Sequence, residues 1–287
     1  MKKSFLILIQ FLTFTFSIFS FDWPQKEIAS DSFFTYFGQF RGGLLSPSLV
    51  FTGTQEINAA SSGYVTLVLS EHDEETQMFE STLGNALFVS HKNELLTVYG
   101  NLSSENIENL YELKEVNEGD FISVAGISGW QEGSGLLEFQ VVDCISKSFV
   151  NPRVLFPRFG NEQAINFSTV YAVDKNGKTY NLNNQKYIPA NSYLIYRDRQ
   201  NQAMPYKTSI LVNGAIESSV SYDSLVSKDG VLSTAGNKNY SSKIVYPDEN
   251  KHLLGEISLS KGKNKITIVL TDLLGKENSK TFNIESW

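Results

Sequence analysis

The feature that most constrains this chain is a glycine-rich turn followed by an alternating strand at residues 133–143, which read GSGLLEFQVVD. Successive side chains of a strand point to opposite faces of its sheet. One face therefore carries Leu137, Phe139 and Val141. The other face carries Glu138 among its residues. A strand with one apolar face and one partly polar face is typical of an antiparallel sheet that packs on a core with only one of its sides. The stretch therefore predicts such a strand.

A second stretch, residues 86–102, reads ALFVSHKNELLTVYGNL and has the pattern of a hairpin. Two apolar segments, 86–90 and 95–99, flank the polar tetrapeptide His-Lys-Asn-Glu at 91–94. Short apolar runs that are joined by a polar turn are typical of β-hairpins. The stretch therefore predicts two neighbouring strands of the same antiparallel architecture.

These two stretches resemble the lysostaphin-like (LytM-type) zinc peptidases, which cut peptide cross-links in bacterial cell walls. Residues 89–102 follow the family pattern I-x-H-x-x-x-x-x-T-x-Y-x-H-L, and residues 136–141 follow H-L-H-F-E-V at their apolar positions. Residues 57–65 match V-x-A-x-x-x-G-x-V, and residues 116–122 match V-x-x-G-D-x-I. The resemblance covers residues 23–157 and implies a LytM-type antiparallel β-sheet domain.

The residues that carry the family's chemistry are replaced in this chain. In the resemblance, the three zinc-ligand positions are occupied by Ser46, Val50 and Glu138. The two proton-handling positions are occupied by Asn101 and Leu136. Zinc in proteins is bound by Cys, His and carboxylate side chains, so that only Glu138 suits the metal. The resemblance therefore implies a peptidase fold with a degenerate groove, in which we expect no catalytic residue, no metal and no cofactor.

Two hairpin residues, His91 and Tyr99, belong to the groove or support it structurally in the same resemblance. The hairpin histidine of the family is not a zinc ligand, and we expect His91 to be a structural histidine at a strand end. His72 lies in an acidic run and is expected to be a solvated loop residue. The single cysteine, Cys144, cannot form a disulfide within the chain and is predicted to be a small buried hydrophobic residue.

The C-terminal part, residues 164–287, predicts a second β domain. It holds short apolar strands that are separated by turn sequences such as Lys-Asn-Gly at 175–177. Several short strands with turns between them are typical of a β-sandwich. Residues 262–276 resemble the last hairpin of bacterial immunoglobulin-like modules. The predicted fold is all-β: a LytM-type antiparallel β-sheet domain followed by an immunoglobulin-like β-sandwich, with the boundary between residues 157 and 164.

Residues 1–20 have the pattern of a signal peptide. Lys2 and Lys3 precede an apolar run, and Ser20 is a small residue suited to the position before a cleavage site. The run is shorter than the roughly 20 residues that a membrane-spanning helix needs. We expect export to the periplasm or cell envelope with cleavage near Ser20, and an uncleaved N-terminal anchor is the alternative.

Three functional hypotheses are compatible with this sequence. The formal net charge of −7 argues against a nucleic-acid partner, which would favour a basic face. The favoured hypothesis is a non-catalytic LytM-type pseudoenzyme that binds peptidoglycan or a cell-wall hydrolase and has a role in cell-wall remodelling. One alternative is an active zinc metalloendopeptidase that cuts peptidoglycan peptide cross-links, with ligands other than those assigned above. The other alternative is a purely structural envelope protein.

Overall fold

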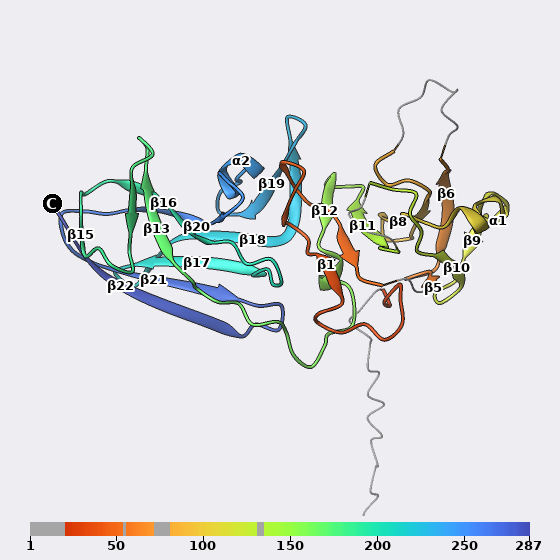
Figure 1. The fold of residues 1–287 in the computed structure, drawn as a ribbon, viewed down its shortest axis with the longest axis horizontal. Coiled ribbons are helices and arrows are strands. Elements are labelled where there is room, and N and C mark those ends of the chain that lie inside the picture. Colours follow the sequence, from red (N-terminus) through yellow and green to blue (C-terminus); the bar gives the residue numbers. More distant parts are fainter. Residues whose placement is uncertain (1–20, 54–55, 72–80, 131–134) are drawn as a thin grey trace, which may run out of the picture.

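The computed structural model of the chain describes residues 21–53, 56–71, 81–130 and 135–287 (Figure 1). The predicted signal peptide, His72 and the beginning of the 133–143 stretch lie outside the described residues. Antiparallel strands dominate the described chain, and the two α-helices are short, α1 (Ile107–Glu112) and α2 (Ser242–Val245). The prediction of an all-β fold is therefore confirmed. Within the described ranges, no helix is both long and apolar enough to cross a membrane.

The N-terminal part is organised around β11 (Glu138–Asp143), which pairs on one side with β8 (Leu95–Gly100). The predicted hairpin is formed by β7 (Ala86–Ser90) and β8, with Phe88 opposite Val98. The other strands of this part are β1 (Phe33–Thr35), β2 (Phe40–Arg41), β3 (Leu44–Leu45), β4 (Leu49–Phe51), β5 (Glu56–Asn58), β6 (Gly63–Leu69), β9 (Glu115–Val116), β10 (Phe121–Val124) and β12 (Ser148–Val150).

The apolar face of β11 carries the core, as its alternation predicts. Leu137, Phe139 and Val141 are fully buried, and they belong to one cluster with residues of β7 and β8. Full burial of a large apolar side chain contributes about 1.5–3 kcal/mol to folding. Tyr99 of β8 lies opposite Phe139, and the two rings meet edge to face at 5.1 Å between their centroids. The core of the N-terminal part therefore lies on one side of the sheet.

The C-terminal part is a sandwich of two sheets. A four-stranded sheet has the order β14-β13-β16-β20, and β22, β21, β17 and β18 form the sheet that faces it. One buried cluster contains side chains from both sheets, among them Ile195 of β16 and Ile268 of β21. The strands are β13 (Val170–Asp174), β14 (Thr179–Asn181), β15 (Tyr187–Ile188), β16 (Ser192–Asp198), β17 (Lys207–Val212), β18 (Ala215–Lys228), β19 (Val231–Gly236), β20 (Lys251–Ser258), β21 (Gly262–Thr271) and β22 (Glu277–Ser286).

One sheet contains strands from both parts of the chain. The two parts lie side by side along the long axis of the molecule in Figure 1. The junction is the antiparallel pair of β12 and β18, in which Phe149 lies opposite Leu225. A third buried cluster also mixes the two parts, since Phe37 packs in it together with Tyr222. The two parts therefore share backbone hydrogen bonds and a core across the predicted boundary, whose position between residues 157 and 164 stays a prediction.

The segment at that boundary is held against the N-terminal part by a buried ion pair. Arg153 Nη2 donates to both carboxylate oxygens of Glu162, at 2.7 and 2.6 Å, and both side chains are only 7% exposed. The ring of Phe159 stacks on Trp23 with 4.8 Å between centroids. Trp23 in turn donates from Nε1 to the carbonyl oxygen of Pro157. These contacts fix the connecting segment in place.

The prediction that Cys144 is buried is wrong. The cysteine is exposed, because β11 ends at Asp143 and residues 144–147 form the turn to β12. The Asp143 carboxylate accepts the backbone N–H groups of Ile145 and Ser146 at 2.8 and 3.0 Å, and this closes the turn. The alternation of the strand therefore stops one residue before the cysteine.

Candidate functional site

The structure brings the predicted ligand and proton-handling positions together at the start of β11. Glu138 lies directly opposite Val50 of β4 on one side. On the other side it lies opposite Gly100 of β8, which is followed by Asn101. Asn101 donates from Nδ2 to the carbonyl oxygen of Leu136 at 2.8 Å. Ser46 is connected to Glu138 through Ser48. The Ser46 hydroxyl donates to the backbone oxygen of Ser48, and the Ser48 side chain contacts Glu138.

The Glu138 carboxylate is engaged by three neighbouring side chains. Ser48 Oγ donates to Glu138 Oε1 at 2.5 Å, and Arg41 Nη1 donates to Oε2 at 2.9 Å. Gln140 Nε2 donates to Ser48 Oγ at 2.9 Å and lies 3.3 Å from Oε1. The side chain of Glu138 is only 8% exposed. A buried carboxylate needs a positive partner and hydrogen bonds, and here a guanidinium supplies the positive charge.

Arg41, Ser48 and Gln140 were not predicted as part of the site. The alternation along β11 contains a signal for Gln140, because side chains two residues apart share a face and Gln140 therefore points the same way as Glu138. Arg41 comes from the separate β2–β3 hairpin, and Ser48 precedes β4. No local pattern connects either residue to β11.

These residues do not fit a zinc ion. Val50 offers no donor atom, and Ser46 is a buried residue whose hydroxyl is bonded to a backbone oxygen. The one carboxylate, Glu138, faces the Arg41 guanidinium, whose charge repels a cation. In the parts of the chain that the structure describes, no group of three or more His, Cys, Asp and Glu side chains could hold a metal ion. The arrangement therefore offers none of the ligand sets that zinc uses.

Asn101 anchors the loop that leads into β11. Its backbone has a φ of 60°, a left-handed conformation that Asn tolerates better than most residues. Its side-chain amide donates to the carbonyl oxygens of Gly126 and Leu136 at 2.9 and 2.8 Å, and it accepts the N–H of Gly129 at 2.8 Å. The residue is 1% exposed and Leu136 is 7% exposed. The two predicted proton-handling positions are thus buried and structural.

His91 and Tyr99 are also held by structural hydrogen bonds. The Nδ1 of His91 lies 2.9 Å from the carbonyl oxygen of Ser62, which only accepts, so that Nδ1 carries the proton. Nε2 therefore accepts from the Thr97 hydroxyl at 2.9 Å. Burial lowers the pKa of His91, because it disfavours the charged form of the ring. Tyr99 accepts the N–H of Ala60, and burial raises the pKa of Tyr99 to about 12.

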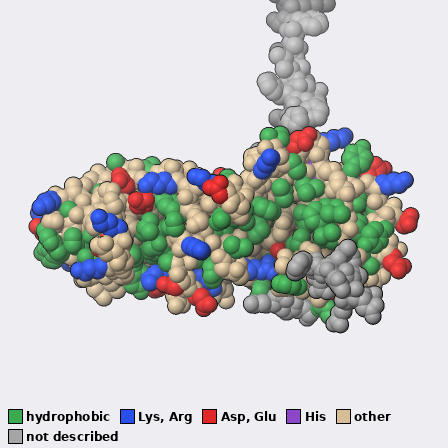
Figure 2. All heavy atoms as spheres, turned by 90° about the horizontal axis from the view of Figure 1, so that it is seen from above, with side chains coloured by type: hydrophobic (Ala, Val, Ile, Leu, Met, Phe, Trp, Pro, Cys, Tyr) green, Lys and Arg blue, Asp and Glu red, His purple; other side chains and the backbone are tan. Residues whose placement is uncertain are grey.

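The second face of the N-terminal sheet is apolar and partly exposed. Leu67 of β6 lies opposite Phe88 of β7, and Leu96 of β8 lies opposite Val142 of β11. Phe88 and Leu96 share this face because Phe88 lies opposite Val98, two residues from Leu96. Leu67 is 46% exposed, and the other three are partly exposed. We call Leu67, Phe88, Leu96 and Val142 the open face; Figure 2 shows hydrophobic side chains gathered at the surface of the N-terminal part, on the right.

A protein of Treponema pallidum (strain Nichols), described as an uncharacterized protein, is 31% identical to this chain over 118 residues. The match spans 38% of this chain and 78% of that protein. This chain belongs to the family of the Treponema pallidum protein. A family model without a descriptive name matches residues 164–286, the part predicted as the immunoglobulin-like sandwich.

Solved structures that are similar to this member of the family include two peptidases. A complex of SpoIIIAH and SpoIIQ contains a chain that is 16% identical, with 46% of this chain and 97% of that chain covered and a TM-score of 0.34. A zinc-containing peptidase from Vibrio cholerae is 17% identical over 38% of this chain and 32% of its own, with a TM-score of 0.28. The deep-sea M23 metalloprotease pseudoalterin is 14% identical over 78% of this chain and 99% of its own, with a TM-score of 0.24. TM-scores this low do not establish a common fold.

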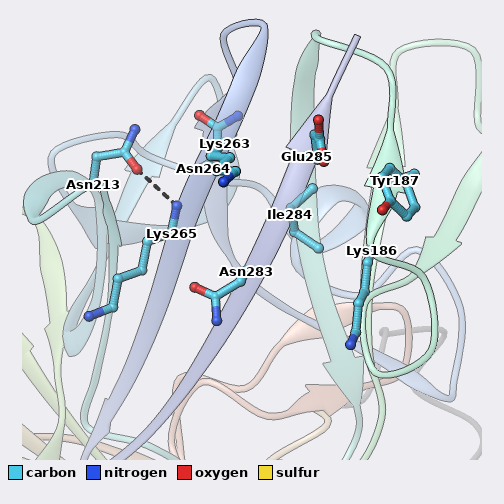
Figure 3. A pocket seen from close by; sticks show the side chains of 9 residues that line it. All are labelled: Lys186, Tyr187, Asn213, Lys263, Asn264, Lys265, Asn283, Ile284 and Glu285. Carbon is cyan, nitrogen blue, oxygen red and sulfur yellow. Dashed lines mark hydrogen bonds between the residues drawn. The ribbon is translucent and has the colours of Figure 1, made fainter.

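The part of this family member that the family model matches carries an open pocket of about 420 Å³ on the outer face of the sandwich (Figure 3). Its charged side chains are spread out, since Lys265 and Lys186 lie at opposite sides of the view with Asn283 between them. Glu285 lies opposite Lys263 on the paired strands β22 and β21. The polar groups of the pocket therefore do not converge on one point.

Proposed function

We propose that this protein is a non-catalytic LytM-type envelope protein that binds a protein partner through its N-terminal sheet. The observation that carries the proposal is the pairing of Glu138 with Arg41 and Ser48. It commits the one carboxylate at a predicted ligand position to an internal ion pair. The groups at the proton-handling positions, Asn101 and Leu136, do not titrate, so that neither suits general acid–base catalysis.

The predicted groove positions themselves are closed to a ligand. All five positions are buried: Ser46, Val50, Asn101, Leu136 and Glu138. A partner that docks on this domain has to use a neighbouring surface, and the open face is an apolar surface that includes Val142 of β11 itself. Apolar side chains within a polar surround are typical of the central part of protein interfaces.

The chemistry of the open face favours a protein over a glycan. Sugar hydroxyls that are buried without a hydrogen-bond partner cost free energy, and Leu67, Phe88, Leu96 and Val142 offer no polar side-chain atom. The LytM resemblance suggests a cell-wall hydrolase as the partner and the periplasm as the place of action. Peptidoglycan itself is the alternative ligand, and cell-wall remodelling is the process that either partner would serve.

Binding to purified sacculi and to purified candidate hydrolases tests the proposal. The full exported chain and the variants Leu67→Glu and Leu96→Glu would be compared, since either substitution places a charge on the open face. Each variant should weaken binding of a hydrolase by about tenfold or more. Leu274→Glu is the matched control, because Leu274 is 42% exposed and lies in a turn of the sandwich.

Two results would contradict the proposal. Equal hydrolase binding by wild type and both open-face variants would remove the open face as the interface. The second result is a wild-type protein that binds sacculi but no hydrolase, while both open-face variants fail to bind sacculi. Peptidoglycan would then be the ligand. Circular dichroism of each variant would show that a loss of binding does not come from unfolding.

A further inference from the structure

A second pocket, of about 460 Å³, lies between the N-terminal part and the sandwich. The N-terminal part contributes Phe34, Phe40 and Arg41 to its wall. The sandwich contributes Arg199, which follows β16, and Glu249, which precedes β20. Pockets of this size commonly bind small molecules, and they are frequent where two domains meet.

Arg199 is held in place while the end of its side chain stays available. Its backbone N–H donates to the carbonyl oxygen of Asn250 at 2.6 Å, and its Nε donates to Asn201 Oδ1 at 2.9 Å. Its guanidinium carbon lies 5.9 Å from the centre of the Phe40 ring. Among the described residues, neither terminal nitrogen of Arg199 has a hydrogen-bond or ion-pair partner. An oriented guanidinium with two such nitrogens matches the two oxygens of a carboxylate.

The walls of this pocket are tied together by hydrogen bonds between the two parts. Gln39 donates from Nε2 to the backbone oxygen of Asn201 at 2.8 Å, and it also accepts the N–H of Tyr36 through Oε1 at 2.9 Å. The Tyr246 hydroxyl donates to the backbone oxygen of Gly38 at 3.0 Å. A site that is already held in shape loses less conformational entropy when a ligand binds.

The pocket also carries one carboxylate. Glu249 is exposed, and no ion pair to it occurs in the described part of the chain. Its neighbour Asp248 pairs instead with Lys251, at 3.0 Å. The second guanidinium of the pocket, that of Arg41, is already neutralised by Glu138 at 2.9 Å. The charges that remain for a ligand are therefore one positive group, Arg199, and one negative group, Glu249.

We propose that this pocket binds a short peptide with free termini. The peptide carboxylate pairs with Arg199 and its ammonium group pairs with Glu249. The rings of Phe34, which is 46% exposed, and Phe40 offer apolar contacts to the atoms between the two charged ends. A ligand with a single charge would leave one of the two protein charges unmatched. This proposal is independent of partner binding by the open face.

Isothermal titration calorimetry of the full exported chain with trialanine tests the proposal. Trialanine with free termini should bind, while the C-amidated and the N-acetylated forms should each bind about tenfold more weakly. In Arg199→Gln the free and amidated peptides should bind equally weakly. In Glu249→Gln the free and acetylated peptides should bind equally weakly. Lys265→Gln changes the pocket on the outer face of the sandwich and should bind like wild type.

Several outcomes would overturn the proposal. The first is that free trialanine gives no heat of binding, and the second is that the free and doubly blocked peptides bind equally. The third is that Arg199→Gln still distinguishes the free from the amidated peptide as the wild type does. A loss in Lys265→Gln as large as that in Arg199→Gln would place the site elsewhere. Because Arg199 and Glu249 are at least partly exposed, both variants should keep the wild-type circular dichroism spectrum.

Discussion

Arg41 donates a hydrogen bond from Nη1 to Glu138 Oε2 over 2.9 Å, although the two residues are 97 positions apart in the chain. The contact places a positive charge beside a residue at which the LytM resemblance places a zinc ligand. It joins the β2–β3 hairpin to the first residue of β11. The ion pair therefore holds two elements of the fold together at the predicted groove positions.

Removing the Arg41 charge should destabilise the protein. In Arg41→Met the Glu138 carboxylate stays buried without its positive partner, and we expect a loss of about 1–3 kcal/mol in the free energy of unfolding, since Arg41 is partly exposed. The double variant Arg41→Met/Glu138→Leu should recover much of that loss, because no charge then remains buried. Urea unfolding followed by circular dichroism measures both effects. Equal stability of wild type and Arg41→Met would show that the pair contributes nothing to folding.

The purified protein should hold no stoichiometric zinc and should not digest cell-wall peptide cross-links. The reason is the set of side chains at the ligand positions, of which Ser46 and Val50 do not bind zinc and Glu138 is paired with Arg41. Elemental analysis after purification in zinc-containing buffer checks the first statement, and release of peptides from sacculi checks the second. One zinc per chain, with hydrolysis that a chelator abolishes, would identify the protein as an active peptidase.

Substitution of Asn101 should separate the hydrogen bonds of its side chain from the strain of its backbone. Asn101→Ala loses three side-chain hydrogen bonds and also places a Cβ residue at a φ of 60°, so that we expect a loss of roughly 2–4 kcal/mol. Asn101→Gly loses the same hydrogen bonds but accepts the backbone conformation, and it should lose about 1 kcal/mol less. Thermal and urea unfolding of both variants give the comparison. A more stable Asn101→Ala than Asn101→Gly would show that the backbone is not strained.

Acidification should destabilise the protein through His252. Burial, assisted by the positive charges of Arg197 and Arg199, lowers the pKa of His252 well below its usual value of 6.5. The folded state therefore binds a proton less readily than the unfolded state. The stability contributed by the neutral ring is present above about pH 6.5 and falls as the pH drops below that value, by up to about 1.4 kcal/mol per pH unit.

The matched variant for this pH dependence is His252→Gln, which retains a polar side chain near the Tyr222 hydroxyl, 2.8 Å from Nε2 in the wild type. Its free energy of unfolding should change less than that of the wild type between pH 7.5 and 5. His91, whose pKa burial also lowers, contributes equally to both proteins and cancels in the comparison. Parallel curves for wild type and variant would show that His252 does not titrate differently in the two states.

The fragment of residues 164–287 should fold, but with lower stability than the full chain. It keeps the sandwich cluster that contains Ile195 and Ile268. It loses β12, whose Phe149 lies opposite Leu225, and it loses Phe37 from the shared cluster. The exposed edge of β18 is also a template for pairing between copies. A cooperative transition at lower urea concentration, with self-association in sedimentation, is expected; an unfolded fragment would show that the two parts form one folding unit.

The sequence determined by itself those features that depend on local alternation. The apolar face of β11 with Leu137, Phe139 and Val141, the β7–β8 hairpin and the sandwich strands all follow from side chains that point to alternate faces of a strand. The convergence of Val50 and Asn101 on Glu138 was also predicted, through the order of the motifs in the LytM resemblance.

Only the tertiary structure decided which side chains surround Glu138 and which form the second pocket. The partners of Glu138 come from a hairpin and a strand entry far away in the chain, and Arg199 meets Phe40 only because one sheet joins the two parts through β12 and β18. Cys144 is exposed because β11 ends at Asp143, directly before it. Such contacts depend on how elements pack in space, and strand alternation describes only one element at a time.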